Sequence, residues 1–286
     1  MGRGERVPDA GSSCDIGDVQ GESSTVLDAP DVVGPGLTSP PMAVLPHEGT
    51  HSIMYGAWPL PFGSSLRTQY VARPDAEGQF PVVLVLPTVD GRSGFEKDLC
   101  RMFARWGVVG IGVDFYRHAD DPLEAYHSLA DRQALTDLDE IHEYVVSDDI
   151  SWAVSGDIGV FGVDVGGRFG IMAAATRSWV KSLAVAYTPL TGDEDRQFQV
   201  ASYLDNLPVP VLGLYGADDD LIDASTVDEA QRRNDHGQWL LYERAGHSFL
   251  DIEADGYDAD AAADAGPRLV EFFKTTLPAA VEVDLG

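Results

Sequence analysis

Three short segments of the sequence carry residue types that could form a hydrolytic site. In GVFGVDVGGRFG, Asp164 stands between Gly162 and Gly166. Further along the chain, GADDD offers carboxylates, of which Asp219 has the G-x-x-D spacing, and AGHSF offers His247. A nucleophile, an acid and a histidine in this chain order are typical of a triad in which the acid orients the histidine. We therefore predict that Asp164, Asp219 and His247 act together.

The glycines beside Asp164 are those that a sharp strand-to-helix turn requires. Such a turn strains the backbone of the central residue and leaves no room for side chains on its neighbours. It also aims the backbone N–H of Val165 and the positive end of the following helix at a reacting oxygen. The segment therefore predicts a nucleophile turn with Asp164 at its centre.

Short strands rich in Val and Leu alternate with helical patterns along the chain, and these elements must position the three segments. A mostly parallel sheet with helices on both faces is the fold class that this alternation predicts. The order nucleophile, acid, histidine is that of an α/β-hydrolase fold, and the short span between YTPL and the strand at Val209 leaves no room for a cap domain. In such sheets the chemistry lies at the carboxyl ends of the strands. The expected strands are 64–74, 81–87, VVGIGVDF, 157–164, SLAVAYTP, VPVLGLYG and QWLLYE, and the expected helices are 95–106, 132–146, a segment ending near 176, 224–233 and 260–276.

The first 48 residues differ in composition from the rest of the chain. They are rich in Gly, Pro, Ser and Asp and show no apolar periodicity, which predicts a disordered or loosely packed leader over residues 1–48. We expect one α/β-hydrolase domain over residues 49–286, since no second boundary or internal repeat is visible.

Composition and charge narrow the classes of partner. The chain has 47 acidic and 19 basic residues, a formal charge of −28, which repels nucleic acid and anionic membranes. This surface suits solvation in general or adaptation to high salt. No apolar run reaches the length of a spanning helix, and no secretory pattern follows the first residues, so a cytoplasmic protein is expected. With two cysteines and no paired histidine motif, we expect neither cofactor nor metal.

Five blocks in order, PVVLVLPTVDG, VGIGVDFYRH, GVFGVDVGG, LYGADDDLI and ERAGHSFLD, resemble the dienelactone hydrolase family of α/β-hydrolases over about residues 64–278. The resemblance implies that Asp164 stands where the family has its nucleophilic cysteine, that Asp219 is the acid and that His247 is the histidine. It also implies an oxyanion hole formed by the backbone N–H groups of Val89 and Val165.

The departures from the family concern the same site. The family usually has a glutamate that helps form the thiolate, and the corresponding residue here is Thr88. A carboxylate is already ionised at neutral pH, so Asp164 needs no such partner. Arginines bind the substrate carboxylate in dienelactone hydrolase; Arg117 is the candidate for one of them, whereas Asp251 lies near the other position and would repel an anion. We therefore do not expect dienelactone as the substrate.

An aspartate nucleophile favours particular chemistry. Attack on an ester would form an anhydride, whereas attack on a saturated carbon bearing an epoxide oxygen or a halide forms an ordinary ester, which water activated by His247 could hydrolyse. This resembles the epoxide hydrolase and haloalkane dehalogenase branches of the fold, although no cap fits between the YTPL segment and the next strand. Tyr116, Tyr187 or Trp58 could donate a hydrogen bond to the leaving group, although each more often serves as a packing aromatic.

Two alternatives remain open at this point. Asp164 and His247 could act as acid and base in a lyase, isomerase or cyclase reaction, because two carboxylates around a histidine favour its protonated form. The fold could also have lost catalysis and serve as a binding or scaffold protein. We expect a small-molecule substrate and a monomer or homodimer.

Overall fold

The computed structural model describes residues 49–286 except 63–64, 117–118, 192–198 and 283–286. The predicted leader over residues 1–48 lies outside the described residues and stays a prediction, as does the boundary at residue 49. All elements named below belong to the described residues.

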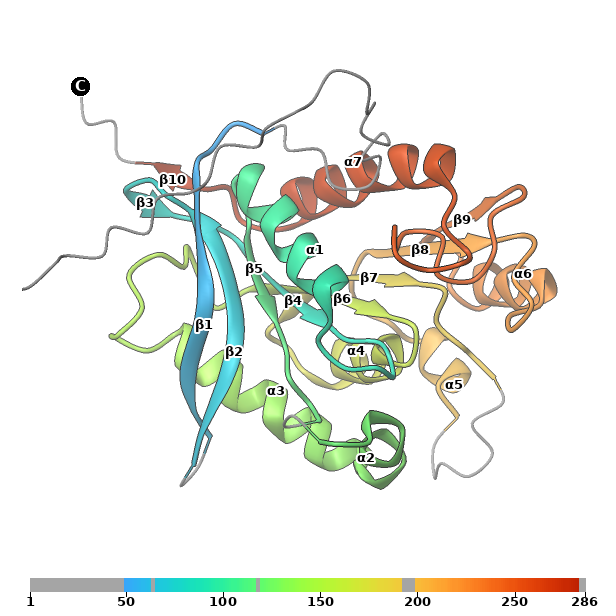
Figure 1. The fold of residues 1–286 in the computed structure, drawn as a ribbon, viewed down its shortest axis with the longest axis horizontal. Helices are drawn as coiled ribbons and strands as arrows, with labels where there is room; N and C mark the ends of the chain where they lie inside the picture. Colours follow the sequence, from blue (N-terminus) through green and yellow to red (C-terminus); the bar gives the residue numbers. More distant parts are fainter. Residues whose placement is uncertain (1–48, 63–64, 117–118, 192–198, 283–286) are drawn as a thin grey trace, which may run out of the picture. The chain divides into compact units, whose positions relative to one another are not determined.

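The central feature is an eight-stranded sheet whose strands follow the order β1-β2-β5-β4-β6-β7-β8-β9 (Figure 1). The six strands from β5 to β9 in that order run parallel, and β1 and β2 join antiparallel at one end. Their bounds are β1 Ile53–Phe62, β2 Ser65–Pro74, β4 Val82–Leu86, β5 Val109–Gly112, β6 Ile158–Val163, β7 Val180–Ala186, β8 Val211–Gly216 and β9 Gln238–Tyr242. The inner parallel strands are buried along their whole length, as their continuous apolar runs predict.

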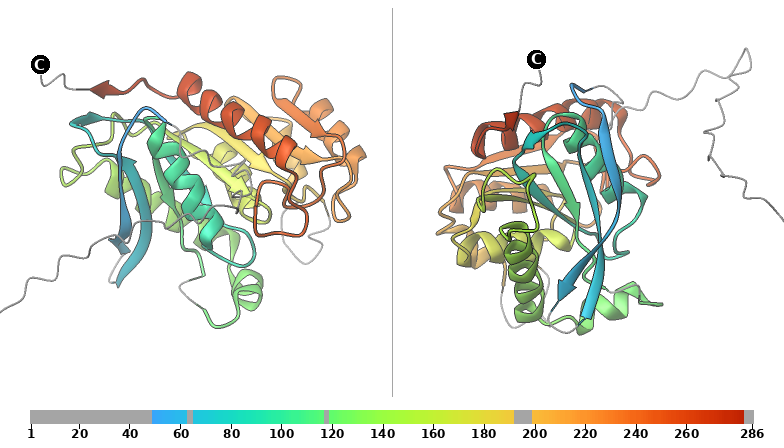
Figure 2. Two further views of the ribbon diagram at one scale, coloured as in Figure 1. Left: turned by 45° about the horizontal axis from the view of Figure 1, so that its top comes forward. Right: turned by 90° about the vertical axis from the view of Figure 1, so that its left-hand side faces the viewer.

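Helices cover both faces of the sheet (Figures 1 and 2). On one face, Phe103 of α1 (Gly94–Arg105) packs edge to face against Phe273 of α7 (Ala259–Thr276), with ring centroids 5.6 Å apart. The other face carries α3 (Asp131–Val145) and α4 (Gly166–Thr176), which contact each other, followed by α5 (Ala201–Leu204) and α6 (Ala224–Arg233). Two layers of helices on a mostly parallel sheet confirm the predicted fold class.

Several elements were not predicted from the sequence. The strand β1 was missed because Pro59 and Pro61 interrupt its pattern, and the sheet tolerates them because β1 is an edge strand. The short helices α2 (Pro122–Ser128) and α5 were also missed, as was the small ladder of β3 (Gly78–Gln79) with β10 (Val281–Glu282). Between β7 and β8, the described residues form α5 and turns only.

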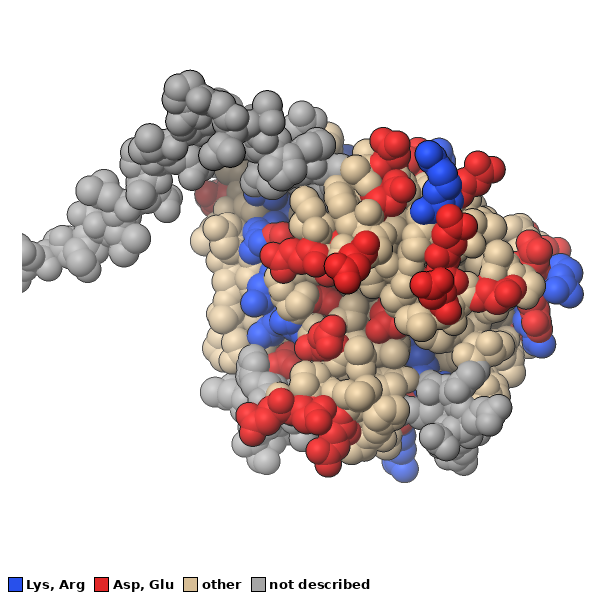
Figure 3. Space-filling model, turned by 45° about the vertical axis from the view of Figure 1, so that its right-hand side comes forward, with Lys and Arg blue, Asp and Glu red and all other residues tan. Residues whose placement is uncertain are grey.

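The described surface reflects the acidic composition. Asp and Glu side chains spread over the face shown in Figure 3, with fewer Lys and Arg side chains among them. None of the described helices combines the length and the apolar character that crossing a bilayer demands.

Candidate active site

Asp164 lies in a strained turn between β6 and α4, as predicted. Its φ of 48° falls in the left-handed region, which non-glycine residues rarely occupy. A Cβ on Gly162 would overlap the Cα of Gly167, and one on Gly166 would overlap the carbonyl oxygen of Pro87. The turn therefore requires both flanking glycines and presses α4 against the end of β4. This strain is of the kind that functional sites store.

His247 and Asp219 form a hydrogen-bonded pair beside this turn. Asp219 follows β8, and its Oδ2 atom lies 2.9 Å from Nδ1 of His247. Its Oδ1 atom accepts the backbone N–H groups of Leu221 and Ile222 at 2.8 and 3.0 Å. The Asp219 side chain is 0% exposed, against 20% for that of His247. Asp219 is thus fixed beside the ring, and Nε2 of His247 lies on the side of Asp164.

The two carboxylate oxygens of Asp164 have different partners. Oδ1 lies 3.7 Å from Nε2 of His247, and Oδ2 accepts the backbone N–H of Val89 at 3.3 Å. Val89 follows β4, the neighbour of β6 in the sheet. The N–H of Val165 donates no hydrogen bond to any described residue. The residues predicted as triad and oxyanion hole therefore lie together, and the Val89 N–H is directed at Asp164 itself.

The two carboxylates change the protonation of His247. Burial lowers the pKa of this histidine, but the Asp164 carboxylate at 3.7 Å and the hydrogen-bonded Asp219 outweigh burial and raise the pKa above its ordinary value of 6.5. The imidazolium form is therefore more favoured in this site than in a histidine free in water.

Tyr187 lies directly against the histidine. It follows β7, is fully buried, and its ring meets that of His247 edge to face with centroids 5.1 Å apart. Its φ of 35° is again left-handed. The hydroxyl has no hydrogen-bond partner among the described residues. Burial, and then the charges of Glu96, Asp251 and Asp164, raise its pKa well above the ordinary value, so the hydroxyl keeps its proton and is a donor.

The other residues predicted to contact the substrate differ in whether they lie at the site. Tyr116 is buried beside the loop after β4, with its ring close to Gly91. Thr88 lies in that loop, but its backbone N–H donates to Glu96 rather than to the site. Arg117 lies outside the described residues. Trp58 was wrongly considered as a donor, because it lies on the edge strand β1 and donates to the Tyr144 hydroxyl at 3.2 Å.

One buried group near the site was not predicted at all. Glu96 in the first turn of α1 is fully buried and accepts hydrogen bonds from Ser93 and from the N–H of Thr88. The Ser93-x-x-Glu96 spacing is a capping-box signal, so the start of the helix could have been found from the sequence. The contact with Thr88 could not, because it depends on how the helix packs against the end of β4.

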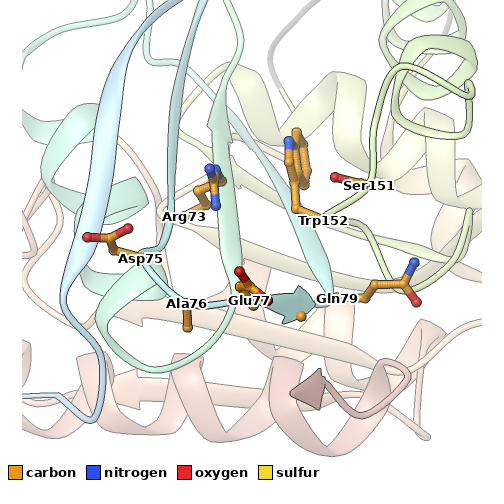
Figure 4. Close-up of a pocket in the computed structure, with 8 residues that line it drawn as sticks. Arg73, Asp75, Ala76, Glu77, Gln79, Ser151 and Trp152 are labelled. Atoms are coloured by element: carbon orange, nitrogen blue, oxygen red, sulfur yellow. The ribbon is translucent and has the colours of Figure 1, made fainter. Parts of the chain in front are cut away.

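Two further features of the described residues, their acidic and histidine side chains and the hollow in Figure 4, do not point to a ligand. No group of three or more His, Cys, Asp or Glu among them could hold a metal ion. A hollow of about 650 Å³ lies near the amino ends of the parallel strands, where Arg73 and Trp152 face each other (Figure 4). Asp75 and Glu77 also line it. Because their negative charges offset the positive charge of Arg73, the hollow favours neither an anionic nor a cationic ligand.

Comparison with known proteins places this geometry in a family. The sequence model of the dienelactone hydrolase family matches residues 68–277 of this chain. The chain is 29% identical over 245 residues to a protein of Escherichia coli (strain K12) named "Putative carboxymethylenebutenolidase", covering 78% of this chain and 88% of that one. It is also 29% identical over 215 residues to a Bradyrhizobium protein named "Probable 2-oxo-3-(5-oxofuran-2-ylidene)propanoate lactonase", covering 70% and 85% of the two chains.

A solved structure agrees with the sequence comparison. The structure titled "Putative Dienelactone Hydrolase" from Klebsiella pneumoniae superposes with a TM-score of 0.71 at 26% identity, covering 78% of this chain and 99% of that one. The family match over residues 68–277 includes Asp164, Asp219 and His247, and it confirms the resemblance found in the five sequence blocks. The chain belongs to the dienelactone hydrolase family and is a hydrolase with an α/β-hydrolase fold.

Proposed function

We propose that this hydrolase opens a small epoxide by covalent attack of Asp164 on a saturated carbon, and that His247, oriented by Asp219, then directs water to the resulting ester. Attack on a halide-bearing carbon is the second form of the same chemistry. Val89 and Val165 supply the oxyanion hole, and Tyr187 contacts the substrate oxygen.

The hydrogen bond from the Val89 N–H to Oδ2 of Asp164 carries this proposal. In acyl transfer the hole must bind the carbonyl oxygen of the substrate. Here its donor already binds an oxygen of the enzyme's own carboxylate, while the other oxygen faces the substrate side near His247. If Oδ1 becomes alkylated, Oδ2 becomes the carbonyl oxygen of the ester, and the hole is directed at that atom. The geometry therefore suits hydrolysis of an ester formed on Asp164.

The first step conserves charge within the site. Oδ1 of Asp164 forms a bond to an epoxide carbon, the carbon–oxygen bond of the ring breaks, and the oxygen takes the proton of the His247 imidazolium. A carboxylate and an imidazolium become an ester and a neutral imidazole. Tyr187 donates a hydrogen bond to the epoxide oxygen but keeps its proton, because burial and three nearby carboxylates disfavour the phenolate.

The second step restores the starting state. Neutral His247 takes a proton from water, and the oxygen of that water attacks the carbonyl carbon of Asp164. The oxyanion that develops on Oδ2 is stabilised by the Val89 and Val165 N–H groups. Collapse expels the alkoxide, which takes the proton of the new carboxylic acid and leaves as a diol. Asp164 is again a carboxylate and His247 is again an imidazolium.

The charges around the site favour an epoxide over a halide. A halide leaves as an anion, and near Tyr187 it would meet the charges of Glu96 and Asp251. It also takes no proton, so it would leave His247 protonated and unable to act as a base. An epoxide oxygen accepts that proton and leaves the site neutral, which is the better match to a histidine of raised pKa.

The test is a search for the ester and for the fate of its carbonyl oxygen. With styrene oxide as probe, His247→Ala lacks the proton donor of the first step and the base of the second. An adduct on the peptide containing Asp164 should therefore form slowly, with solvent supplying the proton, and should persist long enough to be detected by mass spectrometry. Turnover by the wild type in ¹⁸O-water should place the label in the Asp164 carboxylate. If styrene oxide is hydrolysed without an adduct or label, attack by Asp164 is wrong.

A second candidate has support from the raised pKa of His247 alone. As an acid beside the base Asp164, His247 could catalyse a lyase, isomerase or cyclase reaction without a covalent intermediate. That reaction would exchange substrate hydrogen with solvent deuterium but would leave Asp164 unlabelled by ¹⁸O. If the wild type turns over no substrate of any class and Asp164→Asn binds its partners unchanged, a binding or scaffold protein is favoured instead.

A further inference from the structure

Glu96 joins the start of α1 to the loop that carries the oxyanion-hole donor. Its Oε2 atom accepts the backbone N–H of Ser93 at 2.7 Å and the Ser93 hydroxyl at 2.5 Å, which forms the capping box of α1. Its Oε1 atom points the other way and accepts the backbone N–H of Thr88 at 3.2 Å. One carboxylate therefore links the start of α1 to the loop after β4.

A helix cap alone does not account for this carboxylate. A capping box needs one side-chain oxygen on the N-cap N–H, and either Glu or Gln supplies it. Glu96 is 0% exposed, and it forms no ion pair with any Lys or Arg among the described residues. Burying a carboxylate in this way is unfavourable unless hydrogen bonds satisfy it. Its second oxygen is satisfied by Thr88, outside the helix.

The contact with Thr88 fixes the next peptide group along the chain. The carbonyl oxygen of Thr88 accepts the N–H of Gly91 at 3.0 Å, so Thr88 is held at both its N–H and its C=O. The peptide that contains this C=O also contains the N–H of Val89, which points away from Gly91 toward Oδ2 of Asp164. Removing either constraint would let this peptide plane rotate.

We propose that Glu96 is a positioning residue of the active site, whose carboxylate sets the direction of the Val89 N–H through Thr88. This inference rests on the proposed function, in which that N–H binds the oxygen of Asp164 throughout the reaction. The charge of Glu96 also acts on Tyr187, after burial the largest of the influences on that hydroxyl, which is consistent with Glu96 lying close behind the site.

The variant Glu96→Gln separates the two roles of the carboxylate. A glutamine has a single acceptor oxygen, so either Thr88 or Ser93 must lose its N–H partner. The matched control is Ser93→Ala, which removes the capping hydroxyl but leaves both backbone N–H groups on Glu96. Both variants should lower the unfolding midpoint of the full chain.

Activity on styrene oxide distinguishes positioning from capping. Deleting an oxyanion-hole donor costs about 10²- to 10³-fold in kcat, so a donor that is only misdirected should cost less, about 10- to 100-fold. Glu96→Gln should therefore lower kcat by about that factor with KM changed less than about threefold, whereas Ser93→Ala should keep kcat within about twofold. Equal kcat losses in the two variants, or unchanged kcat in Glu96→Gln, would overturn the proposal.

Amide exchange with deuterium, measured without substrate, tests the positioning role independently of the proposed chemistry. In Glu96→Gln the amides of Thr88 and Val89 should exchange with deuterium faster than in the wild type, and in Ser93→Ala they should not. If the wild type turns over no epoxide while this exchange pattern holds, the proposed chemistry fails and the positioning role stands. Unchanged exchange at both amides in Glu96→Gln contradicts positioning whatever the substrate.

Discussion

Buried carboxylates are held in two different ways in this molecule. On the face covered by α3, both oxygens of Asp131 accept the Arg168 guanidinium at 2.9 and 2.7 Å, and Asp137 accepts Arg67 at 2.5 Å. At the carboxyl ends of the strands, Glu96, Asp164 and Asp219 are held by backbone N–H groups, and among the described residues no Lys or Arg pairs with them.

Exposure does not explain this difference. The Asp131 side chain is 10% exposed and that of Asp164 is 14% exposed. A bidentate arginine occupies both oxygens and neutralises the charge, which makes the carboxylate a structural anion. One backbone N–H leaves Asp164 with a charged oxygen free toward His247. The choice of partner, rather than burial, therefore separates carboxylates that hold the fold from those available for chemistry.

The largest effect is expected from removing the free carboxylate. Asp164→Asn should lower kcat on styrene oxide by about 10⁴-fold or more, as loss of a covalent nucleophile does in a triad. Its free energy of unfolding should change by less than about 1 kcal/mol, because no arginine is left unpaired. Chemical denaturation and initial rates measure both quantities; a variant that keeps a tenth of the wild-type kcat would refute the role of Asp164 as nucleophile.

On the α3 face, removing the partner of a carboxylate is expected to lower the free energy of unfolding. Arg168→Met removes the bidentate partner of the Asp131 carboxylate and should lower the free energy of unfolding by about 3–5 kcal/mol. The double variant with Asp131→Leu should recover much of that loss, since an apolar pair can replace a buried ion pair. Urea unfolding measures all three proteins. A single variant as stable as the wild type would mean that Asp131 is not held as a structural anion.

The grouping of Asp164, Asp219 and His247 and most of the fold could be predicted from the sequence because both depend on local signals. The apolar runs of β4, β6 and β8 and the glycines around Asp164 are visible without any contact being known. Parallel strands then bring their carboxyl ends to one edge, which is enough to group Asp164, Asp219 and His247.

What the sequence did not predict depends on contacts between distant segments. The Glu96 to Thr88 bond exists because α1 packs against the end of β4, and no spacing encodes that approach. The direction of the Val89 N–H toward Asp164 has the same origin. Strand β1 was missed for a different reason, since prolines that argue against a central strand are tolerated at an edge.

Tyr187 is a buried polar group without a charge, unlike the carboxylates compared above. Its buried hydroxyl has no partner among the described residues, so Tyr187→Phe should leave the free energy of unfolding unchanged or raise it by about 1 kcal/mol. If the hydroxyl binds the epoxide oxygen, kcat/KM should fall by about 10-fold, the size of one lost hydrogen bond. Thermal unfolding and initial rates are the measurements. A variant that loses stability while keeping kcat/KM would make Tyr187 a structural residue.

The smallest effect concerns the pH dependence of stability. Because the two carboxylates raise the pKa of His247 in the folded state, its contribution to stability is fully present below its unfolded value of about 6.5 and is lost as pH rises through the folded pKa. Asp164→Asn removes one of the two carboxylates, so the imidazole resonance of His247 should titrate at lower pH in that variant. The stability difference between wild type and variant should accordingly shrink as pH rises across this window. An unchanged titration of His247 in Asp164→Asn would mean that Asp219 alone sets the protonation of His247, and that Asp164 does not hold the proton that the epoxide oxygen must receive.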